Sequence, residues 1–248
     1  MPGAQQTFKK AARTLRRLVR QATGSAPRIK VNHRCQRELL GSEYGGWCIC
    51  PSRTSRGTVV YSFGVGADIS FETQIIDKYG AQVHAFDPTP KSIRWIEARA
   101  LPAGLTFHPV GLAHFDGQAR FSLPRADFIS YSMDEQTGSG EPADPTLSAD
   151  IVTADVQRLG TIMKRLGHES IDILKMDIEG AEYSALTDIL DSDVRPNQIL
   201  VEFHYQHADR DAVQRTLQTV EALHRAGYRA FHRSPLGHEC SFIQVAGA

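Results

Sequence analysis

The sequence predicts an α/β fold with a mostly parallel seven-stranded sheet, helices on both faces and an antiparallel hairpin at the C-terminal end. From residue 58 onward, apolar strand-like runs alternate with segments of helical periodicity. The 248 residues are enough for one buried sheet with its helices, but too few for two such domains. The last two runs, YRAFHRS and ECSFIQVA, have no helix between them, which indicates the hairpin.

Each strand is predicted from a short apolar run bounded by turn residues. The predicted strands before the hairpin cover 58–63, 82–88, 105–113, 118–123, 150–156, 170–177 and 197–204. The helices follow from apolar residues at helical spacing, with Gly80 closing the first and Pro90 opening the second. They cover 68–80, 89–100, 156–167, 179–191 and 210–227.

Two segments fall outside this alternation. Residues 38–57 are a lead-in rich in Gly, Ser and Arg, with a short strand expected around 47–50. Residues 124–150 are rich in Gly, Pro, Ser and Asp, so a long loop is expected. A loop of that length in one domain is typical of a lid or a binding loop. We expect the substrate to enter beneath it.

The zero net charge conceals an uneven distribution. Residues 1–37 carry ten Lys or Arg and no acid, whereas the other 211 residues have a balance of −10. Within this basic N-terminal arm, apolar residues recur at helical spacing over 8–22, which predicts a basic amphipathic helix. Contact with a membrane surface, an organelle transit segment, nucleic-acid contact and a solvated helix are the open interpretations. The domain proper is predicted at 38–248.

The remaining composition is ordinary for a globular protein. No apolar run approaches the roughly 20 residues of a membrane helix, and no secretory signal is visible, so a cytoplasmic protein is expected. The four cysteines at 35, 48, 50 and 240 are interpreted as free thiols of a reducing compartment. A zinc cluster of His33 with Cys35, Cys48 and Cys50 is the alternative, but the spacing lacks a Cys-x2-Cys knuckle.

The most informative stretch is SFGVGADISF, residues 62–71. Gly64 and Gly66 follow the first strand directly, where missing Cβ atoms allow a sharp turn and close approach of a ligand to the main chain. A dinucleotide-binding turn would need a third glycine, but Ile69 occupies that position. Asp68 also places a carboxylate where a pyrophosphate would bind. An acid there suits a ligand that carries an amino group.

Asp87 supplies the second half of this signal. It ends the second strand, 21 residues after Gly66, which is the spacing and the place where an acid binds a ribose diol. A ligand with a ribose and an amino group but no required pyrophosphate is S-adenosylmethionine. The sequence therefore predicts a Rossmann-like class I methyltransferase fold.

The chain resembles the FkbM-type methyltransferases. The segments that carry the resemblance span most of residues 40–245, and they are GGWCIC, VVYSFGVGADISFE, VHAFDPTP, DILKMDIEGAEYSAL and ILVEFH. The block LKMDIEGAE is the most specific of them. The resemblance implies O-methylation of a hydroxyl group, often on a sugar or natural product.

One position departs from the pattern of class I enzymes. Many of them have an acid two residues before the first glycine, whereas this chain has Ser62. The methionine amino group of the donor is then left to Asp68, Asp177 or main-chain carbonyls. Residues 111–114, after the third strand, are expected to border the adenine. The predicted cofactor residues are Ser62, Gly64, Gly66, Asp68, Asp87, Gly111 and Asp177.

Methylation of an alcohol needs a general base beside the donor methyl group. Candidates should stand at the ends of the fourth and fifth strands of the sheet, where Asp177, Glu202 and His204 are found. The two-residue period of a strand places Glu202 and His204 on one side. His204 is the first choice because histidine titrates near neutral pH, and Asp177 is the second.

No metal is assigned to the site, although Asp177, Glu202 and His204 could also form a Mg²⁺ site that orients a diol. The expected partner is a small-molecule or carbohydrate acceptor, with no nucleic acid, and residues 8–22 could add a peripheral membrane contact. Two other functions stay open. They are a nicotinamide-dependent oxidoreductase, disfavoured by Ile69 and the MDIEGAE turn, and a non-catalytic scaffold that docks through its basic arm.

Overall fold

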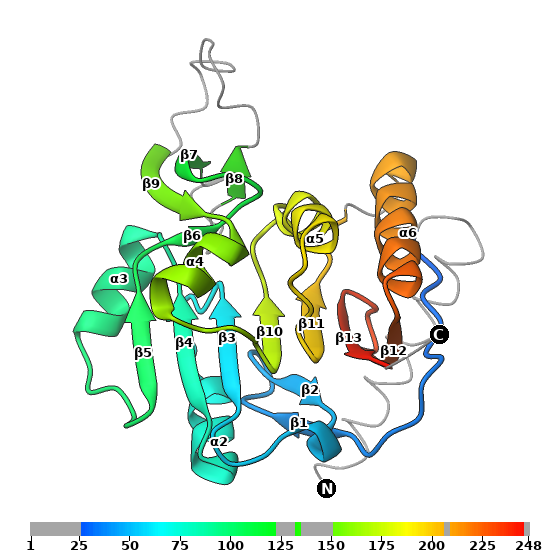
Figure 1. Ribbon diagram of the computed structural model, residues 1–248. Coiled ribbons are helices and arrows are strands. Elements are labelled where there is room, and N and C mark those ends of the chain that lie inside the picture. Colours follow the sequence, from blue (N-terminus) through cyan, green and yellow to red (C-terminus); the bar gives the residue numbers. More distant parts are fainter. Residues whose placement is uncertain (1–25, 123–131, 135–150, 206–208, 246–248) are drawn as a thin grey trace, which may run out of the picture.

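A seven-stranded sheet forms the centre of the computed structural model, which describes residues 26–122, 132–134, 151–205 and 209–245 (Figure 1). The strand order is β12-β13-β11-β10-β3-β4-β5. The strands are β3 (Val59–Phe63), β4 (Gln82–Phe86), β5 (Leu105–His108), β10 (Ile173–Met176), β11 (Gln198–Glu202), β12 (Tyr228–Arg233) and β13 (Glu239–Gln244). All pairs from β11 to β5 are parallel, and β13 runs antiparallel to both β11 and β12. The predicted sheet and hairpin are confirmed.

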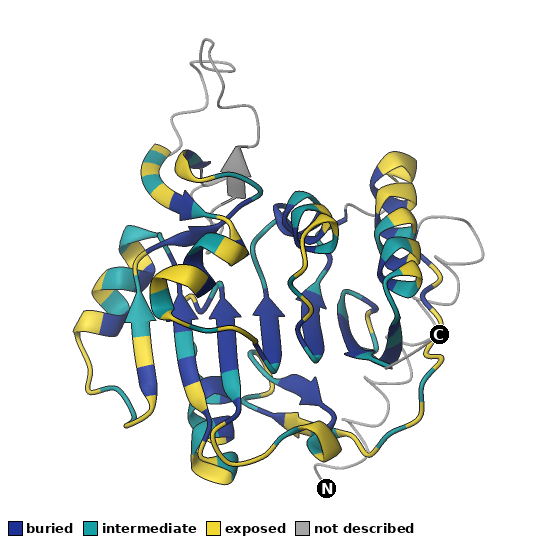
Figure 2. Cartoon of the chain, in the orientation of Figure 1, coloured by how far each residue is buried: buried dark blue, intermediate teal, exposed yellow. Residues whose placement is uncertain are grey.

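Helices cover both faces of this sheet, each near its predicted place. They are α2 (Ser70–Tyr79), α3 (Pro90–Glu97), α4 (Leu159–Leu166), α5 (Glu182–Asp191) and α6 (Arg210–Arg225). Gly80 ends α2 with a left-handed φ of 60°, and Pro90 opens α3 behind the Thr89 cap, as predicted. Figure 2 shows the central strands β3, β10 and β11 mostly buried and the edge strand β5 partly exposed, while the helices expose one side.

Alternate residues of each strand belong to two different hydrophobic cores. Tyr61, Phe63, Leu174 and Met176 pack with residues of α4, α5 and α6 on one face. Neighbours of opposite parity, such as Val60 and Ile173, pack with α2 and the lead-in on the other. Because successive side chains of a strand point to opposite faces, residue parity determines which core each side chain enters.

A smaller four-stranded sheet lies beyond the carboxyl ends of the parallel strands (Figure 1), with the order β6-β9-β7-β8. Its strands are β6 (Gly111–Leu112), β7 (Gly117–Ser122), β8 (Ser132–Asp134) and β9 (Ile151–Gln157). The single strand predicted over 105–113 is therefore wrong, since it divides between two sheets. Pro109 has no N–H for the ladder, and the Val110 N–H turns back to the His108 carbonyl at 2.9 Å.

The predicted 124–150 loop lies mostly outside the described residues. Its described part is β8, which pairs antiparallel with β7, so at 132–134 the loop prediction is wrong. Since β8 adds to a sheet that stands over the strand ends, β8 belongs to the same end of the molecule as the predicted ligand site.

The lead-in forms a hairpin of β1 (Glu38–Leu40) and β2 (Trp47–Ile49), followed by a 3₁₀ turn at Pro51–Arg53. The predicted helix over 8–22 lies outside the described residues. The end of the arm, residues 26–37, packs on the domain, because Ile29 is 1% exposed and Asn32 exchanges hydrogen bonds with Ala230 of β12. Within the described ranges, no helix combines the length and apolarity needed to cross a bilayer.

Candidate functional site

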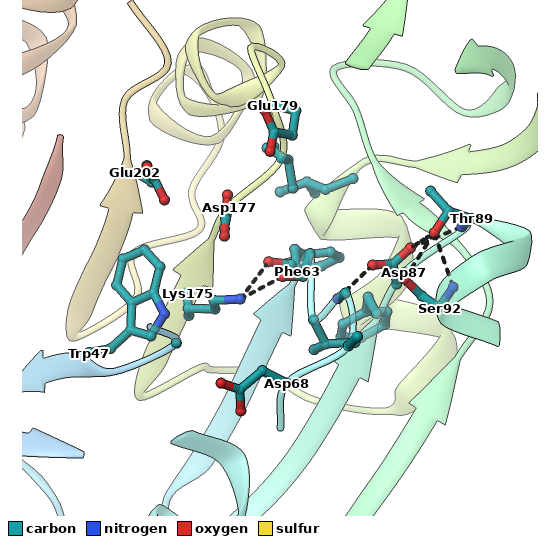
Figure 3. A pocket seen from close by; sticks show the side chains of 18 of the residues that line it. Trp47, Phe63, Asp68, Asp87, Thr89, Ser92, Lys175, Asp177, Glu179 and Glu202 are labelled. Carbon is teal, nitrogen blue, oxygen red and sulfur yellow. Dashed lines mark hydrogen bonds between the residues drawn. The ribbon is translucent and has the colours of Figure 1, made fainter. Parts of the chain in front are cut away.

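A cavity of about 700 Å³ opens at the carboxyl ends of the parallel strands. It lies at the point where the chain leaves β3 for β4 on one side and β10 for β11 on the other, the usual ligand position in such sheets. Its walls come from the 43–47 segment, the glycine turn after β3, the end of β4, the start of β6, and the turns after β10 and β11. Figure 3 shows Asp177, Glu179 and Glu202 on one side and Asp87 with Thr89 and Ser92 on the other.

The two glycines of the first turn have different roles. Gly64 has a φ of 75°, and a Cβ there would stand 1.7 Å from the backbone oxygen of Asp177. Gly66 has a φ of 55°, but a Cβ would meet nothing within 4 Å. The expected close approach of a ligand therefore applies to Gly66, whereas Gly64 allows two turns of the protein itself to touch.

Asp87 is buried and fixes this turn. Its Oδ2 accepts a hydrogen bond from the Gly66 N–H at 3.0 Å, and its Oδ1 accepts from the Thr89 N–H at 2.9 Å and hydroxyl at 2.7 Å (Figure 3). One carboxylate thus joins the glycine turn to the start of α3. Asp87 also lines the cavity, at the place where the sequence predicts a ribose contact.

Asp68 joins the same turn to the lead-in. Its Oδ1 accepts from the Ser70 N–H at 2.8 Å and its Oδ2 from the Ser42 hydroxyl at 2.6 Å. Burial opposes ionisation, but these hydrogen bonds from Ser42 and Ser70 lower the pKa of Asp68. The ionised carboxylate holds the 42–46 segment against the cavity.

Of the other predicted cofactor residues, two line the cavity and one does not. Gly111 and Asp177 line the cavity. Ser62 is fully buried in β3 and is not among the lining residues; its hydroxyl donates to Glu72 of α2. The position that carries an acid in many class I enzymes is thus occupied by a serine, and this serine is hydrogen-bonded to a different acid, Glu72. Of the residues predicted to border the adenine, Gly111 and Leu112 line the cavity, and Ala113 and His114 are not among its lining residues.

The three predicted catalytic residues come together after β10 and β11. Nε2 of His204 lies 3.5 Å from Asp177 Oδ1, 3.4 Å from Glu179 Oε2 and 4.0 Å from Glu202 Oε1. The strand β11 ends at Glu202, so His204 belongs to the following turn. The cluster exists because parallel strands bring their carboxyl ends to one edge.

Glu182 positions this cluster from below. Its side chain is fully buried, Oε1 accepts from the His204 N–H at 2.6 Å, and Oε2 accepts from the Gly180 N–H at 2.8 Å. Between these bonds Glu179 adopts a φ of 50°, the one left-handed non-glycine residue among those described. Such a conformation persists where the surroundings hold it, often at functional sites.

The electrostatics argue against His204 as the base. Burial disfavours the imidazolium, but the carboxylates of Glu182, Glu179 and Asp177 outweigh it and raise the pKa of His204 to about 10. A protonated imidazole has no lone pair to accept a proton. Burial and the charge of Asp177 raise the pKa of Glu202 to about 8, and burial also raises that of Asp177. A carboxylate with such a pKa suits a base near neutral pH.

A cation could also bind in this cluster. One ligand atom each of Asp177, Glu179 and His204 lie within 4.8 Å of one another. Within the described ranges, this is the one group of three or more His, Cys, Asp or Glu residues close enough to hold a metal ion. Glu179 takes the place that the sequence hypothesis gave to Glu202. The four cysteines are free, with Cys48, Cys50 and Cys240 buried.

Several lining residues were missed by sequence reasoning. Glu72 and Lys175 are buried under the glycine turn, and Trp47 and Tyr44 reach the cavity from the lead-in. The GGWCIC segment stood among the motifs that carry the resemblance, which was the available signal for Trp47. For Glu72 the signal was an acid in the first turn of α2, one turn after Asp68.

The strand order, the glycine turn after β3 and the acid after β4 define a Rossmann-like class I methyltransferase fold. The chain belongs to the FkbM methyltransferase family, because the family model described as the methyltransferase FkbM domain matches residues 59–230.

Two curated relatives are similar over much of the chain. Probable methyltransferase-like protein 24 of Homo sapiens is 26% identical over 183 residues, and that of Rattus norvegicus is 24% identical over 182. Each match covers 70% of this chain but 42% of the relative's length.

Solved structures are similar to this chain at low identity. The fibrillarin pre-rRNA processing protein of Methanococcus jannaschii gives a TM-score of 0.42 and 10% identity, covering 88% of this chain and 86% of that one. TYW2 of M. jannaschii, in complex with AdoMet, gives 0.37 and 9%, covering 87% and 90%.

Proposed function

We propose that this chain is an S-adenosylmethionine-dependent methyltransferase that methylates a hydroxyl group of a small molecule or sugar. The observation that carries the proposal is that a single cavity joins the glycine turn and Asp87 to the Asp177–Glu202–His204 cluster. Membership of the FkbM family supports the reaction class. What we propose beyond the family is the identity of the methyl donor and the hydroxyl group as acceptor.

The residues on the Asp87 side fit an adenosyl group. Gly66 leaves open space above its Cα, and Asp87 and Gly111 line the adjoining wall. Asp87 keeps acceptor capacity for a ribose hydroxyl, since each carboxylate oxygen has two lone pairs and its Oδ2 receives one hydrogen bond from the described residues.

The donor would supply a methyl group activated on a sulfonium sulfur. The protein then has to align the acceptor, exclude water and take one proton. We assign the proton to Glu202: the acceptor O–H transfers its hydrogen to this carboxylate as the new oxygen–carbon bond forms and the carbon–sulfur bond breaks. The imidazolium of His204, within 4.0 Å of both Asp177 and Glu202, holds the two acids in place.

Inside the cavity, the acceptor would contact Trp47 and Tyr44. Tyr44 is 86% exposed and lines the cavity, and the buried Trp47 lines it as well. Flat aromatic faces offer a large apolar contact area. This arrangement supports a ring-shaped acceptor such as a sugar or an aromatic natural product.

Calorimetry with S-adenosylmethionine and S-adenosylhomocysteine tests the donor site. Asp87→Asn keeps one oxygen for the turn but removes the charge, and should weaken both ligands at least tenfold, about 1.4 kcal/mol. Asp77→Asn, on the exposed side of α2, is the matched control and should bind normally. A folded wild-type protein that binds neither ligand would refute the proposal. A change in nicotinamide fluorescence when a nicotinamide cofactor is titrated with the protein would support the oxidoreductase instead.

Turnover is tested with a panel of hydroxylated acceptors by measuring released S-adenosylhomocysteine. Glu202→Gln should lower kcat about 100-fold or more, with donor binding unchanged. Loss of activity on adding EDTA, restored by Mg²⁺, would assign the Asp177–Glu179–His204 group to a metal. Activity that tolerates EDTA would leave Glu202 as the proton acceptor.

A further inference from the structure

Glu72 is a buried acid in the floor of the cavity for which the proposed reaction has no use. It lies in the first turn of α2, is 2% exposed, and lines the cavity. One oxygen, Oε1, accepts a hydrogen bond from the Ser62 hydroxyl. The other, Oε2, is buried and has no hydrogen-bond partner among the described residues. A buried carboxylate oxygen without a donor is costly, so a structure that keeps one suggests a ligand contact.

The position of Glu72 follows from strand parity and register. Ser62 of β3 and Lys175 of β10 are direct neighbours in the sheet, and both point to the face that α2 covers. The side chain of Glu72 approaches these two residues from α2 and accepts the hydrogen bond of Ser62. The three side chains thus form a polar floor below the glycine turn, inside an otherwise apolar core.

The charge on this floor is unbalanced. Lys175 Nζ donates to the carbonyl oxygens of Phe63 at 3.3 Å and Gly64 at 2.8 Å, and it lies 5.5 Å from the centre of the Trp47 ring. Its single positive charge acts on three carboxylates, those of Glu72, Asp68 and Asp177. A ligand that brings a positive charge to this floor would balance it.

Asp68 and Asp177 are less suited to be the main anchor for such a charge. Both oxygens of Asp68 are engaged by Ser42 and Ser70, and Asp177 faces the imidazole of His204. Glu72 retains the unengaged buried oxygen.

We infer that Glu72 binds the ammonium group of the methionine tail of S-adenosylmethionine, with Oε2 as the acceptor and Ser62 holding Oε1. The inference rests on the proposed function. It explains the serine at residue 62. The acid that many class I enzymes have at this position is supplied by Glu72 of α2, ten residues later, and Ser62 of β3 positions the Glu72 side chain.

Two ligands separate this role from a general effect on the pocket. S-adenosylhomocysteine carries the amino-acid tail, whereas 5′-methylthioadenosine has the same nucleoside and thioether without it. Calorimetry on Glu72→Gln should show S-adenosylhomocysteine weakened at least tenfold and methylthioadenosine within twofold of wild type. Asp77→Asn removes a charge from the solvent side of the same helix and should change neither ligand.

Ser62→Ala provides a second test that keeps the buried carboxyl group but releases Oε1. It should weaken S-adenosylhomocysteine several-fold and spare methylthioadenosine, even where Glu72→Gln lowers the yield of folded protein. Equal binding of S-adenosylhomocysteine to wild type and Glu72→Gln overturns the inference, and so does an equal loss for both ligands. A folded wild type that binds neither ligand overturns the proposed function, and the inference with it.

Discussion

Gly64 touches the backbone of Asp177, so the glycine turn after β3 and the turn after β10 are in direct contact at the centre of the cavity. A Cβ on residue 64 would stand 1.7 Å from the Asp177 oxygen. This contact joins the glycine turn directly to the turn that carries Asp177 and Glu179.

Gly64→Ala should therefore be far more damaging than Gly66→Ala. The first change forces the Asp177 backbone away, and we expect a loss of unfolding free energy of roughly 3 kcal/mol or more. The second adds only the strain of a positive φ, about 1 kcal/mol, since a Cβ there meets nothing within 4 Å. Urea denaturation measures both. Equal losses for the two variants would contradict the contact.

The proposed base predicts the pH dependence of the reaction. Since burial and Asp177 raise the pKa of Glu202 to about 8, this acid is protonated below pH 8 and accepts a proton only above it. We expect kcat/KM to rise with pH through about 8. The rise should be absent from the residual activity of Glu202→Gln. If that variant keeps the wild-type profile, the proton goes elsewhere.

His84 should make the fold sensitive to acid. Burial, with the nearby charges of His108 and His168, lowers its pKa from 6.5 to about 4. The neutral imidazole, 3.0 Å from His108 Nε2, stabilises the fold fully above pH 6.5, and this contribution is lost as the pH falls from 6.5 towards 4. After allowance for partial exposure, the loss by pH 5 is about 1 kcal/mol.

Thermal unfolding between pH 7.5 and 5 tests this. In His84→Phe the ring stays available for stacking on His108, but the titrating group is gone. The acid limb of its stability curve should be flatter than that of the wild type. Parallel curves would show that His84 does not carry the effect.

Lys175 should be essential for stability even without a ligand. Lys175→Met leaves Glu72, Asp68 and Asp177 without their shared cation, and we expect a loss of about 3 kcal/mol in unfolding free energy. Adding Glu72→Gln should restore about 1 kcal/mol, because one of the unbalanced charges is removed. Strictly additive losses in the double variant would show that the two residues do not interact.

Local patterns predicted most of the fold. Short apolar runs predicted the strands, Gly80 and Pro90 marked helix ends, and the two runs after residue 227 predicted the hairpin. The error at 105–113 arose because Pro109 interrupts an apolar run that looks continuous. Its two halves pair with different sheets, a choice made by strands distant in the sequence.

The site was predicted in part for the same reason. Gly64, Gly66, Asp68, Asp87 and Asp177 stand at strand ends, and their place follows from the parallel topology alone. Glu72 could not be found in this way, since its surroundings depend on Ser62 and Lys175 lying side by side across two strands.

By itself the sequence determined the order of strands and helices, the turn after the first strand of the sheet and the acids that follow it, because periodicity and turn chemistry are local properties of the chain. Only the tertiary structure decided the charge states. The raised pKa of His204 depends on the carboxylates of Glu182, Glu179 and Asp177, which lie in the turn after β10 and at the start of α5. The unengaged oxygen of Glu72 depends on a helix packing over two strands. Such electrostatic effects act through space, between residues that the fold alone brings together.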